Sequence, residues 1–343
     1  MAIELAAPPR VVSNTKYPRL RHCTIIGRSD RDGLTLVVGR EYFELTKVQG
    51  TTEQFLSLKR YLDGYHEIAE ISELTGMSIA SVESVIEEMD RLGLFRQDQA
   101  IREIPRDQFL RRLDDTCEMW GRQIGYHRLF GELQRGAAPK DVFIGLLIET
   151  YHFVKSAPQH ISVAVANANN PRWARLLSEY FVEEYDHAGL ILNTLARIGL
   201  PTDRIIASQP IIGTLSLINM LSEIARRSTL GYLACTALFE ARAEDFEAGK
   251  TEFEAIGAAY GCTADDLAPV VSHVRADVDA GHTGLLAGAL ADVDAIDAVS
   301  AHEAVNYLHD LKHSFDQYHD QVLSYYSDIS NYVPRPQVDY FAL

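Results

Sequence analysis

Cysteine is scarce in this chain of 343 residues, and its four cysteines lie far apart. Cys23, Cys117, Cys235 and Cys262 form no Cys-x-x-Cys pair. Cysteine zinc sites need such local pairs, and disulfide frameworks are typical of small secreted domains. The spacing argues against both, and free thiols fit a reducing cytoplasm.

Long apolar runs are also absent. No stretch approaches the roughly 18 apolar residues that a membrane-spanning helix needs. The opening residues, MAIELAAPPRVVSNTKYPR, lack the charged-then-apolar pattern of a secretory signal. We therefore expect a cytoplasmic protein that does not act at a membrane.

Basic residues are too few for a nucleic-acid-binding protein. The chain has 32 Lys and Arg against 48 Asp and Glu, a net charge of −16. Through Gln97 the counts are 12 and 14, so a charge of −14 belongs to the remainder. Such a charge repels phosphates, and we expect no nucleic-acid partner.

The length predicts two domains, because 343 residues exceed the usual size of one hydrophobic core. We expect a flexible arm over residues 1–15 and a small α+β domain over residues 16–97. Its predicted elements are three β-type runs at 20–26, 34–38 and 42–45, turns at 30–33 and 39–40, and three short helices after Gly50.

Strands followed by three helices are typical of a winged helix. A DNA-binding role is disfavoured because the third helix is acidic, with Glu83, Glu87, Glu88 and Asp90 against Arg91. The stretch YLDGYHEIAEISELTGMSIASVESVIEEMDRLGLF resembles the PqqD-like domain, the RiPP recognition element. The resemblance implies that this domain binds the leader of a ribosomally made precursor peptide as an extra strand. The alternative is a docking or dimerisation module of the same fold.

Helical periods dominate after a predicted linker at residues 98–106. The helical domain should extend over residues 107–332, with an extended tail at 333–343. The predicted helices are 107–134, 140–156, 158–168, 171–199, 211–248, 264–280 and 297–331. The expected fold class is therefore mainly α, a helical bundle preceded by the winged-helix domain.

The predicted helix at 171–199 carries an acid within its apolar stripe. Glu184 lies in the middle of that stripe, and His187 lies one turn further on. A carboxylate aimed into a core is costly unless it is paired or bound to a metal. Glu-x-x-His facing inward is a spacing used in helical-bundle metal sites. A surface pair at the helix edge is the alternative, and the adjacent Glu183 is a lower-ranked ligand.

Two further segments supply acids and histidines. Glu240 follows apolar residues on one face of its predicted helix, although a solvated edge is an alternative. His273 and Asp277 share a face at i, i+4. His282 lies about 140° from Asp277 in a regular helix. A bulge or break at Gly281 could bring it round; otherwise Asp279 and His282 form a separate pair.

Together these segments resemble the haem-oxygenase-like family and its di-iron oxidases and oxygenases. Glu184-x-x-His187, then Glu240 in TALFE 53 positions after His187, then His273-x-x-x-Asp277 follow the family's order. Ala280 stands where the family pattern has its last His.

The resemblance, which covers most of residues 107–290, implies a di-iron site. Glu184 and His187 would hold one metal, and His273, Asp277 and His282 the other, with Glu240 bridging or completing the set. It also implies two Fe(II) ions, with manganese as the alternative, dioxygen as co-substrate, and a homodimer.

Two other motifs imitate the site. Glu149-x-x-His152 has the spacing of the main motif, within a YHFV segment that also resembles the family. Asn306-x-x-x-Asp310-x-x-His313 imitates the third motif. We expect both to lie outside the metal site, and rank Glu149, His152, Asp310 and His313 as secondary ligand candidates.

Carboxylates and imidazoles without thiolates suit non-haem iron or manganese. The family's reactions are N-oxygenation, desaturation and oxidative C–C cleavage of amino-acid or fatty-acid substrates. If the first domain binds a leader, a residue of that peptide would be the substrate.

Two alternatives to a di-iron oxidase remain open. One is a cofactor-free PqqC-like oxidase or a thiaminase-like hydrolase that uses Cys235. The other is a non-catalytic peptide-delivery protein with a decayed metal set.

Overall fold

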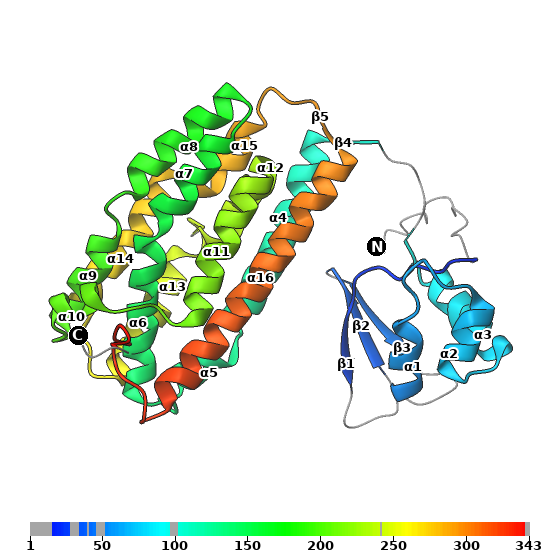
Figure 1. Ribbon diagram of the computed structural model, residues 1–343, viewed down its shortest axis with the longest axis horizontal. Coiled ribbons are helices and arrows are strands. Elements are labelled where there is room, and N and C mark those ends of the chain that lie inside the picture. Colours follow the sequence, from blue (N-terminus) through cyan, green and yellow to red (C-terminus); the bar gives the residue numbers. More distant parts are fainter. Residues whose placement is uncertain are drawn as a thin grey trace, which may run out of the picture. The chain divides into compact units, whose positions relative to one another are not determined.

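The computed structural model describes residues 16–27, 34–39, 41–45, 52–96, 102–240 and 242–339. The chain divides into two compact units, Met1–Ile101 and Arg102–Leu343 (Figure 1). The arm at 1–15, the turn at 30–33, Arg40, and parts of the predicted linker and tail (98–101 and 340–343) lie outside the described residues.

The first unit contains a three-stranded antiparallel sheet with β2 in the middle. The strands are β1 (Thr24–Gly27), β2 (Leu34–Val38) and β3 (Glu41–Leu45). Alternate residues of β2 are buried, as expected for a strand with one face on a core. Helices complete the unit: α1 (Thr52–Lys59), α2 (Ile68–Thr75) and α3 (Ile79–Arg91).

Local signals set the ends of these helices. Gly76 ends α2 with a φ of 67°, a left-handed conformation that suits glycine. Ser78 begins α3, and its side chain accepts a hydrogen bond from the backbone N–H of Ser81. The apolar face of α3 packs into the core of the unit, whereas Glu83 and Glu87 are exposed. The winged-helix and PqqD-like identity of this unit stays a prediction.

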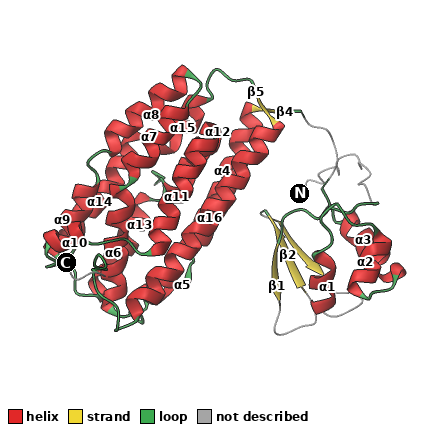
Figure 2. Ribbon diagram, viewed as in Figure 1, coloured by secondary structure: helices red, strands yellow, loops and turns green. Residues whose placement is uncertain are grey.

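The second unit is a helical bundle (Figure 2). Its helices are α4 (Arg106–Gly125), α5 (Arg128–Gln134), α6 (Lys140–Lys155), α7 (Ala157–Asn167), α8 (Pro171–Glu184), α9 (Ala188–Arg197), α10 (Thr202–Ala207), α11 (Ile212–Arg227), α12 (Thr229–Phe239), α13 (Phe246–Ala259), α14 (Ala264–Ala280), α15 (Leu285–Ala289) and α16 (Ala298–Ser327). A short 3₁₀ turn, η1 (His282–Gly284), follows α14, and β4 (Glu103–Pro105) pairs with β5 (Ala295–Asp297).

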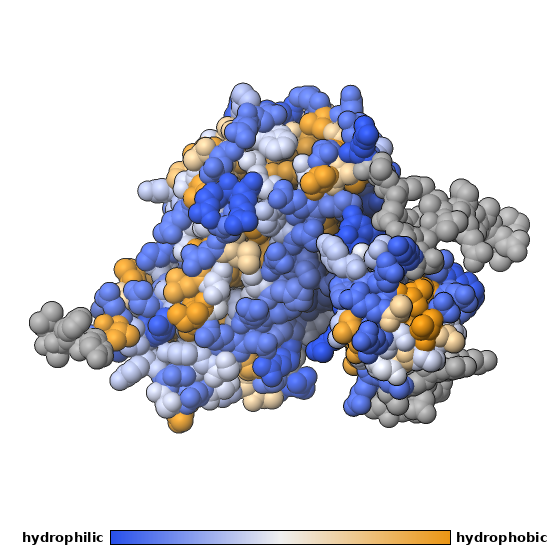
Figure 3. All heavy atoms as spheres, turned by 45° about the vertical axis from the view of Figure 1, so that its right-hand side comes forward, coloured by the Kyte–Doolittle hydropathy of each residue, from blue (hydrophilic) through white to orange (hydrophobic). Residues whose placement is uncertain are grey.

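The longest helix, α16, packs along α11, α12 and α6 (Figure 1). Its approach to α6 requires Gly145, because a Cβ there would lie 2.3 Å from the ring of Tyr326. On the face seen in Figure 3, apolar groups of the bundle are scattered among hydrophilic ones. Within the described ranges, no helix has the length and apolar character needed to cross a membrane.

Three predicted helices are interrupted. The segment 107–134 forms α4 and α5, the segment 171–199 forms α8 and α9, and the segment 211–248 forms α11, α12 and the start of α13. The apolar spacing continues across the break at residues 185–187. This stretch contains no glycine or proline, so no local stop signal marks the end of the helix. Helices α10 and α15 were not predicted, because they have only six and five residues.

Candidate metal centre

Six residues from four segments converge inside the bundle. Glu184 ends α8, His187 precedes α9, and Glu240 directly follows α12. His273 and Asp277 lie on α14, and His282 opens η1. Their side chains are between 1% and 14% exposed. These are the six residues predicted as principal ligands.

Their donor atoms form two groups that could each hold a metal ion, with all atoms of a group within 4.8 Å of one another. The first group is Glu184, His187, His273 and Asp277. The second is Glu184, Glu240, Asp277 and His282. Glu184 and Asp277 belong to both groups, which is the arrangement of carboxylates that bridge two ions.

In the first group, His187 Nδ1 lies 3.2 Å from Glu184 Oε2 and 3.3 Å from Asp277 Oδ1. His273 Nδ1 lies 2.9 Å from Asp277 Oδ2. The two imidazole rings are neighbours, with centroids 5.0 Å apart. Two nitrogens and two carboxylates therefore surround one small volume.

In the second group, His282 Nδ1 faces three carboxylates. It lies 3.2 Å from Glu184 Oε1, 3.4 Å from Glu240 Oε2 and 4.0 Å from Asp277 Oδ1. A proton on this nitrogen can be donated well to only one of them. A cation placed among these groups would contact them all.

The unsatisfied hydrogen-bonding atoms of the cluster fit a metal site. Eight buried side-chain atoms of the described residues have no hydrogen-bond partner, and six of them belong to this cluster. They are Glu184 Oε1, His187 Nδ1, both ring nitrogens of His273, Asp277 Oδ1 and His282 Nδ1. Buried polar atoms are normally paired, so their concentration at one point fits a metal site rather than a structural network.

Two neighbouring side chains orient the second group. The hydroxyl of Tyr180 donates to Glu240 Oε1 at 2.5 Å, and the Tyr180 ring packs edge-on against His282. His282 Nε2 lies 2.9 Å from Glu183 Oε2. A proton on Nε2 would leave Nδ1 free to bind a metal, as carboxylate–histidine–metal arrangements require. Glu183 was predicted as a lower-ranked ligand. It contacts Nε2 of His282, whereas Nδ1 of the same ring faces the cluster.

Sequence reasoning missed Tyr180. Its signal was available, because it lies one helical turn before Glu184 and therefore on the same face of α8.

The crowding of acids and histidines changes the pKa values of the cluster. The nearby carboxylates of Asp277 and Glu184 raise the pKa of His187 to about 10. Burial opposes charge on His282, but the nearby Glu240 and Glu183 outweigh it and raise its pKa to about 9. Burial likewise raises the pKa of Glu240. Protons thus balance the clustered carboxylates, and a bound metal would displace them.

Breaks in the backbone bring these groups together. Helix α14 ends at Gly281, whose φ of 73° is left-handed, and His282 begins the next turn. Of the two alternatives left open at Gly281, the structure has the break. Ala280, at the position of the family's last His, is exposed. The break lets His282 enter the cluster from two positions later.

The grouping differs from the prediction. We expected Glu184 with His187 on one metal, and His273, Asp277 and His282 on the other. The geometry instead groups His187 with His273, and Glu240 with His282. The reason is that both Glu184 and Asp277 lie between the two groups, which helical spacing alone cannot show.

The twin motif at residues 149–152 is satisfied by protein partners. Glu149 accepts hydrogen bonds from the hydroxyls of Tyr326 at 2.6 Å and Thr214 at 2.5 Å, and from the Ile211 N–H at 3.1 Å. His152 Nε2 lies 2.9 Å from Ser208 Oγ. Burial raises the pKa of Glu149 and lowers that of His152 to about 4. The geometry includes neither in a metal-capable group.

The remaining candidates also lie outside both groups. Asp279 is exposed, and the side chains of Asp310 and His313 are 57% and 52% exposed on α16. Cys235 is fully buried in α12, and burial raises its thiol pKa. A buried thiol of this kind is a poor nucleophile, which opposes the thiaminase-like alternative.

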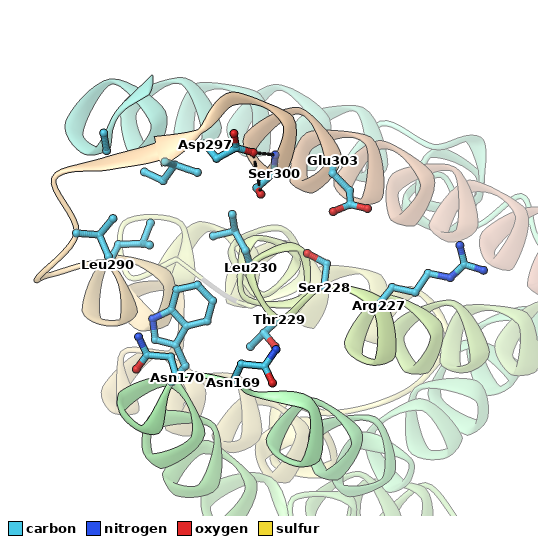
Figure 4. A pocket seen from close by; sticks show the side chains of 14 residues that line it. Asn169, Asn170, Arg227, Ser228, Thr229, Leu230, Leu290, Asp297, Ser300 and Glu303 are labelled. Carbon is cyan, nitrogen blue, oxygen red and sulfur yellow. Dashed lines mark hydrogen bonds between the residues drawn. The ribbon is translucent and has the colours of Figure 1, made fainter. Parts of the chain in front are cut away.

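A separate pocket of about 550 Å³ lies near the starts of α8, α12 and α16 (Figure 4). Asn170, Ser228 and Asp297, which cap these helices, line it, and each cap accepts a hydrogen bond from its own helix. None of the six cluster residues lines this pocket. It is therefore distinct from the metal centre.

Comparisons with known proteins agree with this geometry. Residues 144–309, which include all six cluster residues, match the family described as iron-containing redox enzymes, a haem-oxygenase-like family. A domain of unknown function with a haem-oxygenase-like fold from Shewanella denitrificans is 18% identical, with a TM-score of 0.56 over 65% of this chain and 97% of its own.

A TenA homologue from Pseudomonas syringae pv. tomato is 12% identical, with a TM-score of 0.49 over 64% of this chain and 93% of its own. No curated protein matches the chain. The likeness to the Shewanella structure shows that the helical unit has the haem-oxygenase-like fold.

Proposed function

We propose, from the match of residues 144–309 to iron-containing redox enzymes, that the helical unit is a dioxygen-dependent non-haem di-iron oxidase or oxygenase. One observation carries this proposal: two groups of four ligands share Glu184 and Asp277. Shared carboxylates hold two ions close enough to act on one substrate molecule.

The donor set suits the proposed metal. Four carboxylate or imidazole side chains in each group, without thiolate, suit iron or manganese. His187 and His273 would complete one position, and Glu240 and His282 the other. Two ferrous ions would supply the electrons that dioxygen reduction requires.

The protein's own residues hold and shield the site. Tyr180 fixes Glu240, and Glu183 fixes His282, so that the donor atoms already face the centre before metal binds. The near-complete burial of Glu184, Glu240 and His282 keeps bulk water away from the reacting groups.

The proposed substrate is an amino-acid residue, within a ribosomally made precursor peptide whose leader is held by the first unit. The reaction is N-oxygenation, desaturation or C–C cleavage. Strand β3 is at the edge of the described sheet, and Tyr42 on it is 72% exposed, so an added strand has a place to pair. Tethering would raise the concentration of the residue at the metal centre.

The test begins with the metal-free full chain. Ferrous iron is added without oxygen, bound iron is counted, and dioxygen uptake is then followed. We expect about two irons per chain and oxygen consumption that needs them. Absence of bound iron would overturn the proposal. A precursor peptide encoded beside the gene should then gain an oxygen atom, lose two hydrogens or lose a carbon fragment by mass spectrometry.

A further inference from the structure

Histidines outside the buried cluster form a second candidate site on α16. His309 and His313 are the only two histidines of the chain that lie three or four positions apart. One helical turn separates them, so their side chains lie on the same face. Their ring centroids are 4.4 Å apart, and the two Nε2 atoms are 3.1 Å apart.

This separation fits a single metal ion. With metal–nitrogen bonds of about 2.0–2.1 Å, two nitrogens on one ion lie about 2.9 Å apart at a right angle and about 3.4 Å apart at a tetrahedral angle. The observed 3.1 Å lies between these values. Without the ion, the two Nε2 atoms share a hydrogen bond. A metal ion that displaces the proton between them could bind both nitrogens with little movement of the side chains.

Carboxylates lie on the other side of both rings. His309 Nδ1 is 3.9 Å from Asp310 Oδ1, and His313 Nδ1 is 3.5 Å from Asp316 Oδ2. At these distances the carboxylates do not form strong hydrogen bonds with the rings, but their negative charge favours a cation nearby. Asp316 is itself held by Lys312 at 2.6 Å.

Packing and exposure complete the arrangement. The ring of His309 lies against Trp120 of α4, with centroids 5.3 Å apart, which restricts its rotation. The side chains of His309 and His313 are 25% and 52% exposed, so an ion from solution can reach them. The buried cluster is far less exposed, with His282 at 1%.

We propose that His309 and His313 form a second, surface site for one divalent transition-metal ion, separate from the proposed di-iron centre. Two imidazole ligands with water in the remaining positions suit Cu²⁺, Ni²⁺ or Zn²⁺. The sequence had singled out His313 as part of an imitation of the family's third motif. The geometry pairs it with His309 instead.

The test uses a resin that carries chelated Ni²⁺ or Cu²⁺ and the untagged full chain. An immobilised ion cannot enter the buried cluster, so retention reports on exposed histidines. We expect the unmodified chain to be retained and eluted by imidazole. His309→Gln and His313→Gln should each elute near the void, because one histidine alone binds the resin weakly.

His302→Gln is the matched control. This exposed histidine lies on the same helix, and no other histidine lies three or four positions from it. It should elute with the unmodified chain. Circular dichroism checks the fold, and His313→Gln leaves the His309–Trp120 contact in place. Failure of the unmodified chain to bind, unchanged retention of both pair variants, or an equal loss in His302→Gln would each overturn the proposal.

Discussion

Two Glu-x-x-His motifs lie inside the same bundle and differ in their partners. Glu149 and His152 are buried, and the carboxylate accepts three hydrogen bonds while the imidazole pairs with Ser208. Glu184 and His187 have the same spacing, but Glu184 Oε1 and His187 Nδ1 lack hydrogen-bond partners. The sequence spacing makes both pairs candidates for metal binding. Whether their polar atoms already have hydrogen-bond partners distinguishes the structural pair from the metal-binding one.

The backbone also differs between the two Glu-x-x-His motifs. Glu149 and His152 lie within one continuous helix, α6. A helix ends between Glu184 and His187, which lets the histidine turn toward Asp277 on α14. A break of this kind lets ligands from several segments meet at one point.

The largest expected effect is on metal content. Glu184→Ala removes a carboxylate shared by both groups, so we expect bound iron to fall from about two per chain to nearly none. Glu149→Ala should retain its iron, because no metal-capable group includes it. Iron is measured colorimetrically after anaerobic loading, with circular dichroism as the folding control. Iron loss in Glu149→Ala alone would reverse the assignment of the two motifs.

The free energy of unfolding should show the opposite order, with a larger loss in Glu149→Ala than in Glu184→Ala. Glu149→Ala leaves the Tyr326 and Thr214 hydroxyls and the Ile211 N–H without their acceptor. At about 1–3 kcal/mol for each unsatisfied buried group, the free energy of unfolding should fall by about 3 kcal/mol or more. Metal-free Glu184→Ala should lose much less. Urea unfolding of both metal-free variants measures the difference, and equal losses would contradict the comparison.

A smaller effect tests the two tyrosines whose hydroxyls donate hydrogen bonds to Glu240 and to Glu149. Tyr180→Phe removes the hydrogen bond to Glu240, and loss of such an outer contact typically weakens metal binding about 10- to 100-fold. We expect about tenfold weaker binding of one of the two irons, seen by competition with a chelator. Tyr326→Phe is the matched control at Glu149 and should leave iron affinity unchanged.

A further effect is on the pH dependence of the metal-free protein. Burial lowers the pKa of His152 to about 4, below about 6.5 in the unfolded chain. The unfolded state therefore binds the extra proton, and stability falls as pH drops from 6.5 toward 4.

His187, with a pKa of about 10, has the opposite sign. The folded state holds the extra proton, so its contribution is present below pH 6.5 and is lost as pH rises toward 10. Each of these two histidines contributes at most about 1.4 kcal/mol per pH unit to the slope. Urea unfolding at several pH values should show His152→Gln flattening the acid slope and His187→Gln the alkaline one. If His152→Gln flattened the alkaline slope and His187→Gln the acid slope, the result would contradict the account.

The sequence predicted much of the framework because the signals were local. Apolar periods located most helices, Ser78 marked a cap, and Gly281 marked the break before His282. Inward-facing acids identified Glu184 and Glu240 as members of the cluster. Such signals depend on neighbours within one or two turns.

What the sequence did not show depends on contacts between distant segments. The grouping of His187 with His273 requires knowing how α9 packs on α14. The satisfied state of Glu149 depends on Tyr326, 177 positions away. The break after Glu184 has no glycine or proline, and its conformation is set by tertiary packing rather than by local propensity.

The most direct test of the central claim is a crystal structure of the iron-loaded protein with anomalous scattering recorded at the iron edge. The account predicts two iron peaks about 3.5–4 Å apart, each in contact with both Glu184 and Asp277. His187 and His273 should bind one of them, and Glu240 and His282 the other. A single peak, or iron at Glu149 and His152, would contradict it.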